Sequence, residues 1–327
     1  MDTVFVSGQL PGDAVAVLSE SFEVVQDDGG VASEAFAACA DRVRGIVALL
    51  TDRIDAALLD RTPRLAVVGN VAVGVDNVDL AACAARGVVV TNTPDVLTEA
   101  TADLAFGLLI AAARRICEGD RLVRAGQFTG WTPTFLLGTR VHGMKLGIVG
   151  LGRIGKAVAR RARGFGMHVG YWQRHREPEG IERALGATWV PSLDELCASS
   201  DAITIHTPLT EETRHLFSAE RLAKMRPGSI LVNTARGPIV DEAALAHALE
   251  HGPLAAAGLD VFEDEPRVHP ALLARPNAVL APHIGSADRA TREAMASTAA
   301  ANVIRVLRGE PPLTPVVPAS GSPSTRE

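Results

Sequence analysis

Cysteine is scarce in this chain of 327 residues, which has four cysteines and no C-x-x-C spacing. Clustered cysteines mark disulfide frameworks and zinc sites, so their absence argues against both. An excess of basic residues is also missing, because 32 lysines and arginines face 38 acidic residues and the net charge is -6. Binding to nucleic acid or acidic membranes would favour the opposite balance. We therefore expect no metal site, no nucleic-acid partner and no membrane partner, and we interpret the cysteines as reduced core residues of a cytoplasmic protein.

Long hydrophobic runs are absent as well. The chain begins MDTVFVSGQ, without a cationic segment followed by an apolar one, so we expect neither a signal peptide nor a membrane span. Hydrophobic residues nevertheless make up 47% of the chain and charged residues 21%. This composition is typical of a globular protein with a large core, and the length favours more than one domain.

Residues 145–163, KLGIVGLGRIGKAVARRAR, contain the motif around which the chain is organised. A short apolar run typical of a buried strand is followed by Gly150, Gly152 and Gly155 and then by helical apolar spacing. The first glycine permits a sharp turn, the second lets a pyrophosphate approach the backbone, and the third allows close packing of helix on strand. This strand, loop and helix together predict a dinucleotide-binding Rossmann unit.

The end of the next strand, expected at residues 167–172, lacks the acidic residue that holds the adenosine ribose of NAD. Gln173 stands there instead, followed by the basic residues Arg174, His175 and Arg176. A neutral residue followed by cations suits the 2'-phosphate of NADP(H). An exposed basic turn without a ligand would look the same, so we predict a preference for NADP(H) and keep NAD(H) as possible.

Short apolar runs alternate with helical patterns on both sides of the motif, which predicts parallel strands with crossover helices. Before the motif, strands are expected at residues 4–6, 24–25, 46–50, 65–68 and 88–90. After it, further strands are expected near residue 189 and at 202–205, 229–233, 256–260 and 278–280. We predict an α/β protein with two doubly wound parallel-sheet domains.

Two long helical patterns, residues 98–117 and 286–307, flank the nucleotide-binding part of the chain. Because the second has to return toward the first domain, we expect a domain of residues 1–98 plus 287–315. The nucleotide-binding domain, residues 99–286, is inserted into it, with a cleft between the two. Residues 316–327 are rich in proline, serine and glycine and are expected to form a disordered tail.

Three expected strands end in side chains suited to chemistry on an anionic substrate. Arg236 can bind a carboxylate with its planar fork, His283 can donate a proton to a carbonyl oxygen, and Glu265 can keep that imidazole protonated. Each could instead be an ordinary surface ion pair, turn acid or strand-end histidine. Their joint occurrence at strand ends favours a catalytic site.

Several segments together resemble the D-isomer-specific 2-hydroxyacid dehydrogenase family, most closely its glyoxylate and hydroxypyruvate reductases. The segments are VAVGVDNVDL, TPDVLTEATADLAFGLLIAAARR, GWTPTFLLG, GLGRIG, NTARG, GLDVFEDEP and PHIGSA. The resemblance spans residues 1 to about 313, and ordered motifs are more specific than any single one. It implies a flavodoxin-like substrate domain, an inserted Rossmann domain, and NADPH-dependent reduction of a small 2-oxo acid to the D-2-hydroxy acid.

The resemblance also implies roles for individual residues. Arg236 would bind the substrate carboxylate and carbonyl, Glu265 would be the partner of the histidine, and His283 would be the acid/base. Substrate contacts are expected from Leu50, Val73, Gly74 and Trp131, of which Leu50 and Trp131 could be core residues instead. Beyond the glycine motif and the basic turn, cofactor contacts are expected from Thr101, Arg153, Ile154, Thr207, Thr234, Ala235, Asp260 and Gly285.

Other functions remain open. Another D-2-hydroxyacid dehydrogenase, acting on 3-phosphoglycerate or a branched 2-oxo acid, is one alternative, although residues 45–80 lack an extra basic cluster for a phosphate. A dinucleotide-sensing protein similar to the corepressor relatives of the family is another. Residues 118–140 correspond to the dimerisation arm of the family, which implies a homodimer in which Trp131 reaches the partner subunit.

Overall fold

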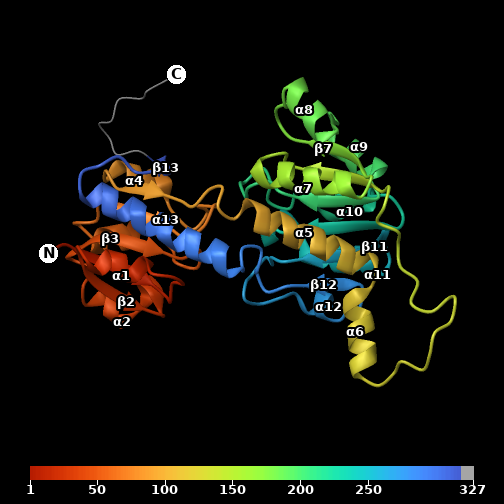
Figure 1. The fold of residues 1–327 in the computed structure, drawn as a ribbon, viewed down its shortest axis with the longest axis horizontal. Helices are drawn as coiled ribbons and strands as arrows, with labels where there is room; N and C mark the ends of the chain where they lie inside the picture. Colours follow the sequence, from red (N-terminus) through yellow and green to blue (C-terminus); the bar gives the residue numbers. More distant parts are fainter. Residues whose placement is uncertain (318–327) are drawn as a thin grey trace. The chain divides into compact units, whose positions relative to one another are not determined.

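The computed structural model describes residues 1–317, and the chain divides into two compact units (Figure 1). Unit 1 comprises Met1–Leu97 and the described residues from Ser286 onward, and unit 2 comprises Thr98–Gly285. Each passage of the chain from one unit to the other lies one residue before the expected position. Within residues 1–317 we find no helix that is long and apolar enough to cross a membrane.

Unit 1 is built on a six-stranded sheet in the order β13-β5-β4-β3-β1-β2. Its strands are β1 (Thr3–Ser7), β2 (Glu23–Asp27), β3 (Val43–Ala48), β4 (Val67–Asn70), β5 (Val89–Thr91) and β13 (Pro315–Val317). Its helices are α1 (Ala14–Ser19), η1 (Gly30–Ala32), α2 (Glu34–Ala37), α3 (Ala56–Arg61), α4 (Leu80–Ala85) and α13 (Arg289–Leu307). The first five strands are parallel and follow the flavodoxin-like order, so the predicted α/β class is confirmed for this unit.

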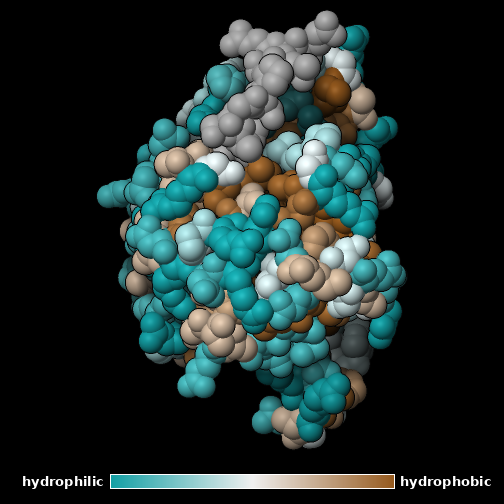
Figure 2. Space-filling model, turned by 90° about the vertical axis from the view of Figure 1, so that its left-hand side faces the viewer, coloured by the Kyte–Doolittle hydropathy of each residue, from teal (hydrophilic) through white to brown (hydrophobic). Residues whose placement is uncertain are grey.

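Side chains from both faces of this sheet are buried, which explains the apolar strands. On one face Phe5 meets Phe36 edge to face, with ring centroids 4.9 Å apart. On the other face α13 packs so closely that a Cβ on Gly69 would lie 2.9 Å from the carbonyl oxygen of Ala299. Figure 2 shows a mainly hydrophilic face of the molecule, with hydrophobic residues visible in a band across its middle.

The prediction that residues 316–327 are a disordered tail is wrong at its start. Pro315–Val317 form β13, which pairs antiparallel with β5. Asn302 of α13 fixes the approach, because its Oδ1 accepts hydrogen bonds from the backbone N–H groups of Leu313 and Thr314 at 2.8 and 3.1 Å. The rest of the predicted tail, residues 318–327, lies outside the described residues.

Unit 2 contains a seven-stranded parallel sheet in the order β12-β11-β10-β9-β6-β7-β8. Its strands are β6 (Lys145–Val149), β7 (His168–Trp172), β8 (Ala187–Trp189), β9 (Ala202–Ile205), β10 (Ser229–Asn233), β11 (Leu254–Leu259) and β12 (Ala278–Leu280). Its helices are α5 (Thr98–Ala113), α6 (Ile116–Arg124), α7 (Arg153–Gly164), α8 (Glu179–Leu185), α9 (Leu193–Ser199), α10 (Ala219–Ala223), η2 (Gly237–Ile239), α11 (Glu242–Glu250) and α12 (Pro270–Leu273). The strand order reverses direction at β6, the strand that precedes the glycine motif.

Both faces of the second sheet are covered by helices, as expected for a Rossmann unit. Ile230 and Val232 of β10 join the core beneath α5 and α7, whereas Leu231 between them joins the core beneath α9, α10 and α11. Because successive strand side chains point to opposite faces, a strand buried on both sides is apolar throughout. This is why β10 has the sequence SILVN.

The single helix expected at residues 98–117 is interrupted. Helix α5 ends at Ala113, and Arg115 adopts a left-handed conformation (φ 54°) before α6 begins. The carbonyl oxygen of Ala113 accepts a hydrogen bond from the backbone N–H of Thr139 at 2.8 Å instead of continuing the helix. The helix expected at residues 286–307 begins later than predicted, at Arg289. Asp288 caps it by accepting a hydrogen bond from Thr291 N at 2.8 Å.

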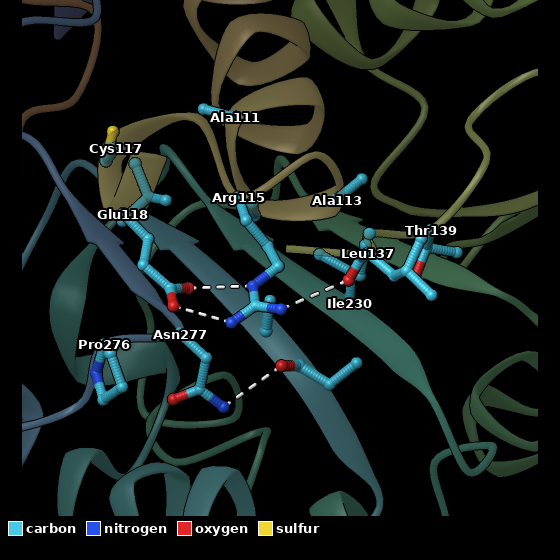
Figure 3. Close-up of a pocket in the computed structure, with 15 residues that line it drawn as sticks. Ala111, Ala113, Arg115, Cys117, Glu118, Leu137, Thr139, Ile230, Pro276 and Asn277 are labelled. Atoms are coloured by element: carbon cyan, nitrogen blue, oxygen red, sulfur yellow. Dashed lines mark hydrogen bonds and ion pairs between the residues drawn. The ribbon is translucent and has the colours of Figure 1, made fainter. Parts of the chain in front are cut away.

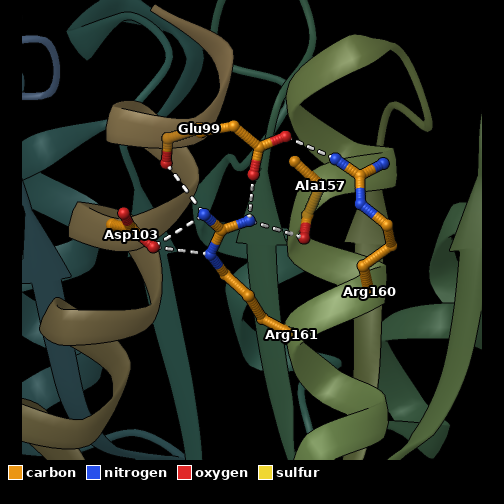
Figure 4. Close-up of polar contacts among 5 residues, drawn as sticks. All are labelled: Glu99, Asp103, Ala157, Arg160 and Arg161. Atoms are coloured by element: carbon orange, nitrogen blue, oxygen red, sulfur yellow. Dashed lines mark hydrogen bonds and ion pairs between the residues drawn. The ribbon is translucent and has the colours of Figure 1, made fainter.

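Helices α5 and α7 are joined by charged side chains (Figure 4). Arg161 of α7 binds Glu99 Oε2 at 2.8 Å, Asp103 Oδ1 at 2.7 Å and the carbonyl oxygen of Glu99 at 3.1 Å, and Arg160 binds Glu99 Oε1 at 2.5 Å. These bonds connect the first turn of α5 to the helix that follows the glycine motif. They therefore set the position of Thr101, which lies on α5 between the two acidic residues.

Helix α7 packs on β6 through Gly155, where a Cβ would lie 2.2 Å from the carbonyl oxygen of Gly150. We predict that Gly155→Ala lowers the free energy of unfolding by about 1–3 kcal/mol, the usual cost of forcing atoms into a packed interior. Gly164→Ala on the same helix is the matched control, because a Cβ there meets nothing within 4 Å and should stabilise slightly. Urea denaturation followed by circular dichroism measures both, and equal stability of the two variants would contradict the packing role.

Candidate active site

Three segments of unit 2 meet beyond the carboxyl ends of β10, β11 and β12. Gly237 fixes the approach of the first two, because a Cβ on it would lie 1.9 Å from the backbone carbon and oxygen of Phe262. The turn that carries Arg236 is held by Asn233, whose Nδ2 donates to the carbonyl oxygen of Arg236 at 2.9 Å and whose Oδ1 accepts from Ala235 N at 3.0 Å. Arg236 is thereby placed beside the segment of residues 260–265.

His283 and Glu265 form a hydrogen-bonded pair, with 2.7 Å between Nδ1 and Oε2. The other carboxylate oxygen of Glu265 accepts from Phe262 N at 3.0 Å. Since Nδ1 is engaged by the carboxylate, Nε2 is the nitrogen through which His283 can transfer a proton to a substrate. About a quarter of the imidazole surface is exposed, so the ring is accessible.

The backbone around His283 is held by Asp260. The two carboxylate oxygens of Asp260 accept hydrogen bonds from Ile284 N and Gly285 N, each at 2.7 Å, and its carbonyl oxygen accepts from His283 N at 2.8 Å. His283 itself has a left-handed backbone (φ 54°). Such strain persists only where surrounding contacts impose it, and here Asp260 supplies those contacts.

The two carboxylates of this region differ in electrostatics. Burial raises the pKa of Asp260, and the two N–H groups that it accepts oppose this only in part. Burial also acts to raise the pKa of Glu265, but the hydrogen bonds from His283 and Phe262 and the charges of His283 and Arg236 outweigh it, so that the pKa of Glu265 is lowered. Glu265 therefore places a charged carboxylate against the imidazole of His283.

The glycine loop has the geometry that a dinucleotide requires. Gly150 has φ 92°, and a side chain on it would lie 2.7 Å from the carbonyl oxygen of His206. A Cβ on Gly152 would meet nothing within 4 Å, so this glycine leaves open space in front of α7. No side chain caps that helix at Gly152, and its first N–H groups are available to a pyrophosphate.

Buried polar atoms near the same strand ends also fit a bound cofactor. The hydroxyl of Thr234 is buried and has no hydrogen-bond partner within residues 1–317. Thr101 is buried on α5 next to Gly285, with its Cγ2 3.5 Å from the position of a Cβ on that glycine. Because buried polar groups are nearly always paired, the hydroxyl of Thr234 indicates a ligand in this region.

The remaining residues expected to bind the cofactor occupy three places. Arg153 and Ile154 begin α7, Thr207 follows β9 next to Gly150, and Ala235 lies in the turn after β10. His206 was missed by the sequence interpretation, although it directly precedes Thr207. Burial lowers the pKa of His206 to about 3, its Nε2 lies 2.8 Å from Thr204 Oγ1, and its buried Nδ1 has no partner within residues 1–317.

The turn after β7 is more structured than the sequence indicated. Gln173 Oε1 accepts from Leu151 N of the glycine loop at 2.9 Å, and Gln173 Nε2 donates to the carbonyl oxygen of His175 at 2.7 Å. Arg174 is 75% exposed and lies 3.5 Å from Glu212. Arg176 turns away to Glu182, with hydrogen bonds of 2.9 and 2.7 Å from its Nε and Nη2.

Unit 1 and the segment after α6 carry the residues expected to contact the substrate. Leu50 and Val73 are exposed rather than core residues. The carbonyl oxygens of Val73 and Gly74 accept hydrogen bonds from Asn92 and Asn70, which fixes the course of this loop. Trp131 is 79% exposed in an irregular segment and is also not a core residue.

A pocket of about 280 Å³ lies at the opposite ends of the strands (Figure 3). It is lined by the first residues of β10, β11 and β12 and by Arg115, which binds Glu118 at 2.8 and 2.6 Å and the carbonyl oxygen of Leu137 at 3.3 Å. The catalytic candidates follow the carboxyl ends of the same strands. This pocket is therefore separate from the candidate active site.

Comparison with known proteins assigns the chain and its fold to one family. Residues 106–285 match the NAD-binding domain of D-isomer specific 2-hydroxyacid dehydrogenases. A glyoxylate reductase of Thermococcus onnurineus is 48% identical over 317 residues, covering 95% of this chain and 94% of the relative. The chain therefore belongs to the D-isomer specific 2-hydroxyacid dehydrogenase family, and the resemblance found in the sequence is confirmed.

Solved structures agree with this assignment. An NADPH-dependent glyoxylate/hydroxypyruvate reductase from Sinorhizobium meliloti, solved with NADP and malonate, has a TM-score of 0.87 and 36% identity and covers 99% of both chains. A D-lactate dehydrogenase from Aquifex aeolicus, solved with NAD and lactic acid, has a TM-score of 0.86 and 27% identity and covers 99% of this chain and 100% of the other. Members with this fold thus bind either dinucleotide.

Proposed function

We propose that this enzyme reduces a small 2-oxo acid, glyoxylate or hydroxypyruvate, to the corresponding D-2-hydroxy acid, with NADPH as the preferred donor. The observation that carries the proposal is the 2.7 Å pair of His283 and Glu265 beside Arg236, at strand ends of a dinucleotide-binding unit. The names of the glyoxylate reductases that are similar over almost the whole chain support the substrate class.

The proposed chemistry assigns one task to each side chain. The nicotinamide cofactor supplies a hydride to the carbonyl carbon of the substrate. Arg236 binds the substrate carboxylate and carbonyl through its planar guanidinium. His283 donates the proton from Nε2 to the carbonyl oxygen as negative charge develops there, and Glu265 keeps the imidazole oriented and charged until then. Asp260 holds the strained backbone on which His283 is mounted.

The substrate class follows from the contacts assigned through the family. The backbone N–H groups of Val73 and Gly74 bind the substrate carboxylate, while Leu50 and Trp131 limit the size of the substrate side chain. A small 2-oxo acid fits such contacts better than a branched one. A phosphorylated substrate would need additional cations, which the sequence near this loop does not provide.

The preference for NADPH rests on Gln173 and the basic residues after it. A carboxylate at that position would repel a 2'-phosphate, which carries nearly two negative charges, and Gln173 does not. Arg174, His175 and Arg176 were assigned to the phosphate from the sequence. The engagement of Arg176 by Glu182 makes Arg174 the better candidate of the two arginines.

A substrate and cofactor panel tests the function directly. Oxidation of NADPH and of NADH is followed with glyoxylate, hydroxypyruvate, pyruvate and 2-ketoisocaproate. We expect the highest kcat/KM with NADPH and one of the first two acids, by about tenfold or more over NADH. Higher efficiency with 2-ketoisocaproate would favour another dehydrogenase, and negligible turnover with every acid would favour a dinucleotide-sensing protein.

His283→Ala should lower kcat by about a hundredfold or more, because general acid catalysis contributes on the order of 10² to 10⁴ in rate. Affinity for NADPH, measured by calorimetry, should stay close to that of the unmodified protein. His251→Ala, which alters an exposed histidine of the same unit, is the control. A variant at position 283 with nearly normal kcat would exclude His283 as the proton donor.

Arg236→Lys should be severely impaired even though the positive charge is kept, because an ammonium group cannot form the two parallel hydrogen bonds of a guanidinium. Steady-state kinetics with glyoxylate measure the loss, and Arg267→Lys at an exposed ion pair serves as control. If only KM rises and kcat is retained, Arg236 contributes uniform binding alone.

Glu265→Gln should move the alkaline limb of the pH profile for reduction toward acid by about one pH unit or more, the usual effect of a nearby charge. The lowered pKa of Glu265 keeps its carboxylate charged even below its ordinary titration range, so the unmodified enzyme has this charge at neutral pH. Without the charge, the proton-donating form of the site is less stabilised, so activity should fall earlier as pH rises. Glu263→Gln, which removes a carboxylate paired with His215, should leave the profile unchanged.

Residues 118–140 correspond to the dimerisation arm of the family, which predicts a two-fold homodimer. Helix α6 buries none of its residues, and large apolar side chains of the arm are exposed, among them Val123, Phe128, Trp131 and Leu137. We expect sedimentation at micromolar concentration to give a dimer, with Trp131 in contact with the partner. Val123→Glu should weaken it, whereas Leu273→Glu, equally exposed but outside the arm, should not. A monomer under these conditions would refute the prediction.

A further inference from the structure

The turn after β7 contains two charged clusters, which meet where the backbone N–H of Glu177 donates to the hydroxyl of Tyr171 at 2.8 Å, and only the second is bonded to the glycine loop. In the first cluster Glu182, whose side chain is 8% exposed, accepts hydrogen bonds from Arg176 and from the hydroxyl of Tyr171 at 2.7 Å. These bonds lower the pKa of Glu182 to about 2. Glu182 occupies Nε and Nη2 of Arg176, and its negative charge opposes a phosphate beside the same guanidinium, so this arginine is poorly placed as a phosphate ligand.

The second cluster begins at Gln173 and is connected to the glycine loop. While its Oε1 accepts from Leu151 N, its Nε2 donates to Glu177 Oε1 at 3.1 Å. The other oxygen of Glu177 lies 2.8 Å from Lys156 Nζ. Gln173 stands where a Rossmann unit recognises the cofactor ribose. The carboxylate of Glu177 is bonded to it directly, and the ammonium group of Lys156 is one contact further away.

The ion pair of Lys156 and Glu177 also connects the two segments of the fold between which the adenosine ribose is expected. Lys156 lies in the first turns of α7, directly after the loop that holds the pyrophosphate, and Glu177 lies between β7 and α8. The adenosine ribose of a dinucleotide binds between these two segments in a Rossmann unit. Lys156 lowers the pKa of Glu177, and both side chains remain partly exposed, at 32% and 18%. Both side chains can thus be reached by a ligand.

We propose that Lys156 and Glu177 are a pair of opposed determinants of cofactor selectivity: Lys156 binds the 2'-phosphate of NADP(H), and Glu177 limits that preference and accepts the 2'-hydroxyl of NAD(H). The inference rests on the proposed use of a nicotinamide dinucleotide and refines its preference for NADPH. A phosphate with nearly two negative charges competes with Glu177 for Lys156 and is repelled by Glu177. A ribose hydroxyl is neutral, donates to the carboxylate and leaves the ion pair intact.

Equilibrium binding tests the proposal without relying on turnover. Dissociation constants of NADP⁺ and NAD⁺ are measured by calorimetry for the full chain and for Lys156→Gln and Glu177→Gln. We expect Lys156→Gln to weaken NADP⁺ by about tenfold and to change NAD⁺ by less than about threefold, the size of one charge-assisted contact at a wet edge. Glu177→Gln should act in the opposite sense, tightening NADP⁺ and weakening NAD⁺ severalfold.

Matched controls separate selectivity from folding. Arg160→Gln removes another exposed cation of α7, one that is paired with Glu99, and should leave the ratio of the two dissociation constants unchanged. Melting temperatures of all variants establish that each is folded. Because Lys156→Gln and Glu177→Gln remove the same ion pair, a merely structural role would change both affinities in the same direction in both variants.

The outcomes distinguish this inference from the broader proposal. If the unmodified protein binds both dinucleotides equally and the two variants still respond in opposite directions, the NADPH preference fails and the inference stands. If neither variant changes the ratio, the inference is overturned even where the unmodified protein prefers NADP⁺. A loss of NADP⁺ selectivity in Arg176→Gln, with Lys156→Gln unaffected, would also overturn it and return the role to Arg176.

Discussion

The candidate active site depends on one constraint: three segments that follow neighbouring parallel strands are locked together through their backbones. Gly237 admits no side chain against Phe262, and the carboxylate of Asp260 binds the N–H groups that follow His283. Side chains attached to such a rigid backbone keep their relative positions, so they have little conformational freedom to lose when a ligand binds. This frame holds His283 and Glu265 in contact at 2.7 Å. A general acid depends on being held in a fixed orientation, and the frame provides that orientation.

Much of this arrangement could be predicted from the sequence because its causes are local. Strands buried on both faces are apolar throughout, as in β6 and β10, and a glycine motif between a strand and a helix is typical of a dinucleotide-binding loop. The candidate catalytic residues were chosen for a related reason: parallel strands bring their carboxyl ends to one edge, so polar residues that end several strands are expected to be neighbours. Their roles, however, came from the resemblance to the family, since spacing alone leaves ordinary surface roles open.

What could not be predicted depends on partners that only the folded chain brings together. Helix α5 ends where the carbonyl oxygen of Ala113 accepts a hydrogen bond from Thr139 N, and no residue near Ala113 indicates that contact. Pro315–Val317 form a strand because Asn302 binds the chain just before them. Arg176 resembled a phosphate ligand in the sequence because its partner, Glu182, is identifiable as a buried carboxylate only in the structure. In each case a local pattern was correct about tendency, and a hydrogen bond formed only in the folded chain decided the outcome.

The same principle explains why cofactor preference is harder to infer than cofactor class. The class of cofactor, a dinucleotide, depends on the space left by the missing side chains of Gly150 and Gly152, which any other residue would fill. Preference depends on which charges near Gln173 are still able to meet a phosphate once their partners in the folded protein are counted. Lys156, Arg174 and Arg176 all have carboxylate partners, but these differ in burial, from the enclosed Glu182 to the exposed Glu212. A ligand competes with each partner, so Lys156 and Arg174, whose carboxylates stay partly exposed to water, can meet a 2'-phosphate at a lower cost than Arg176.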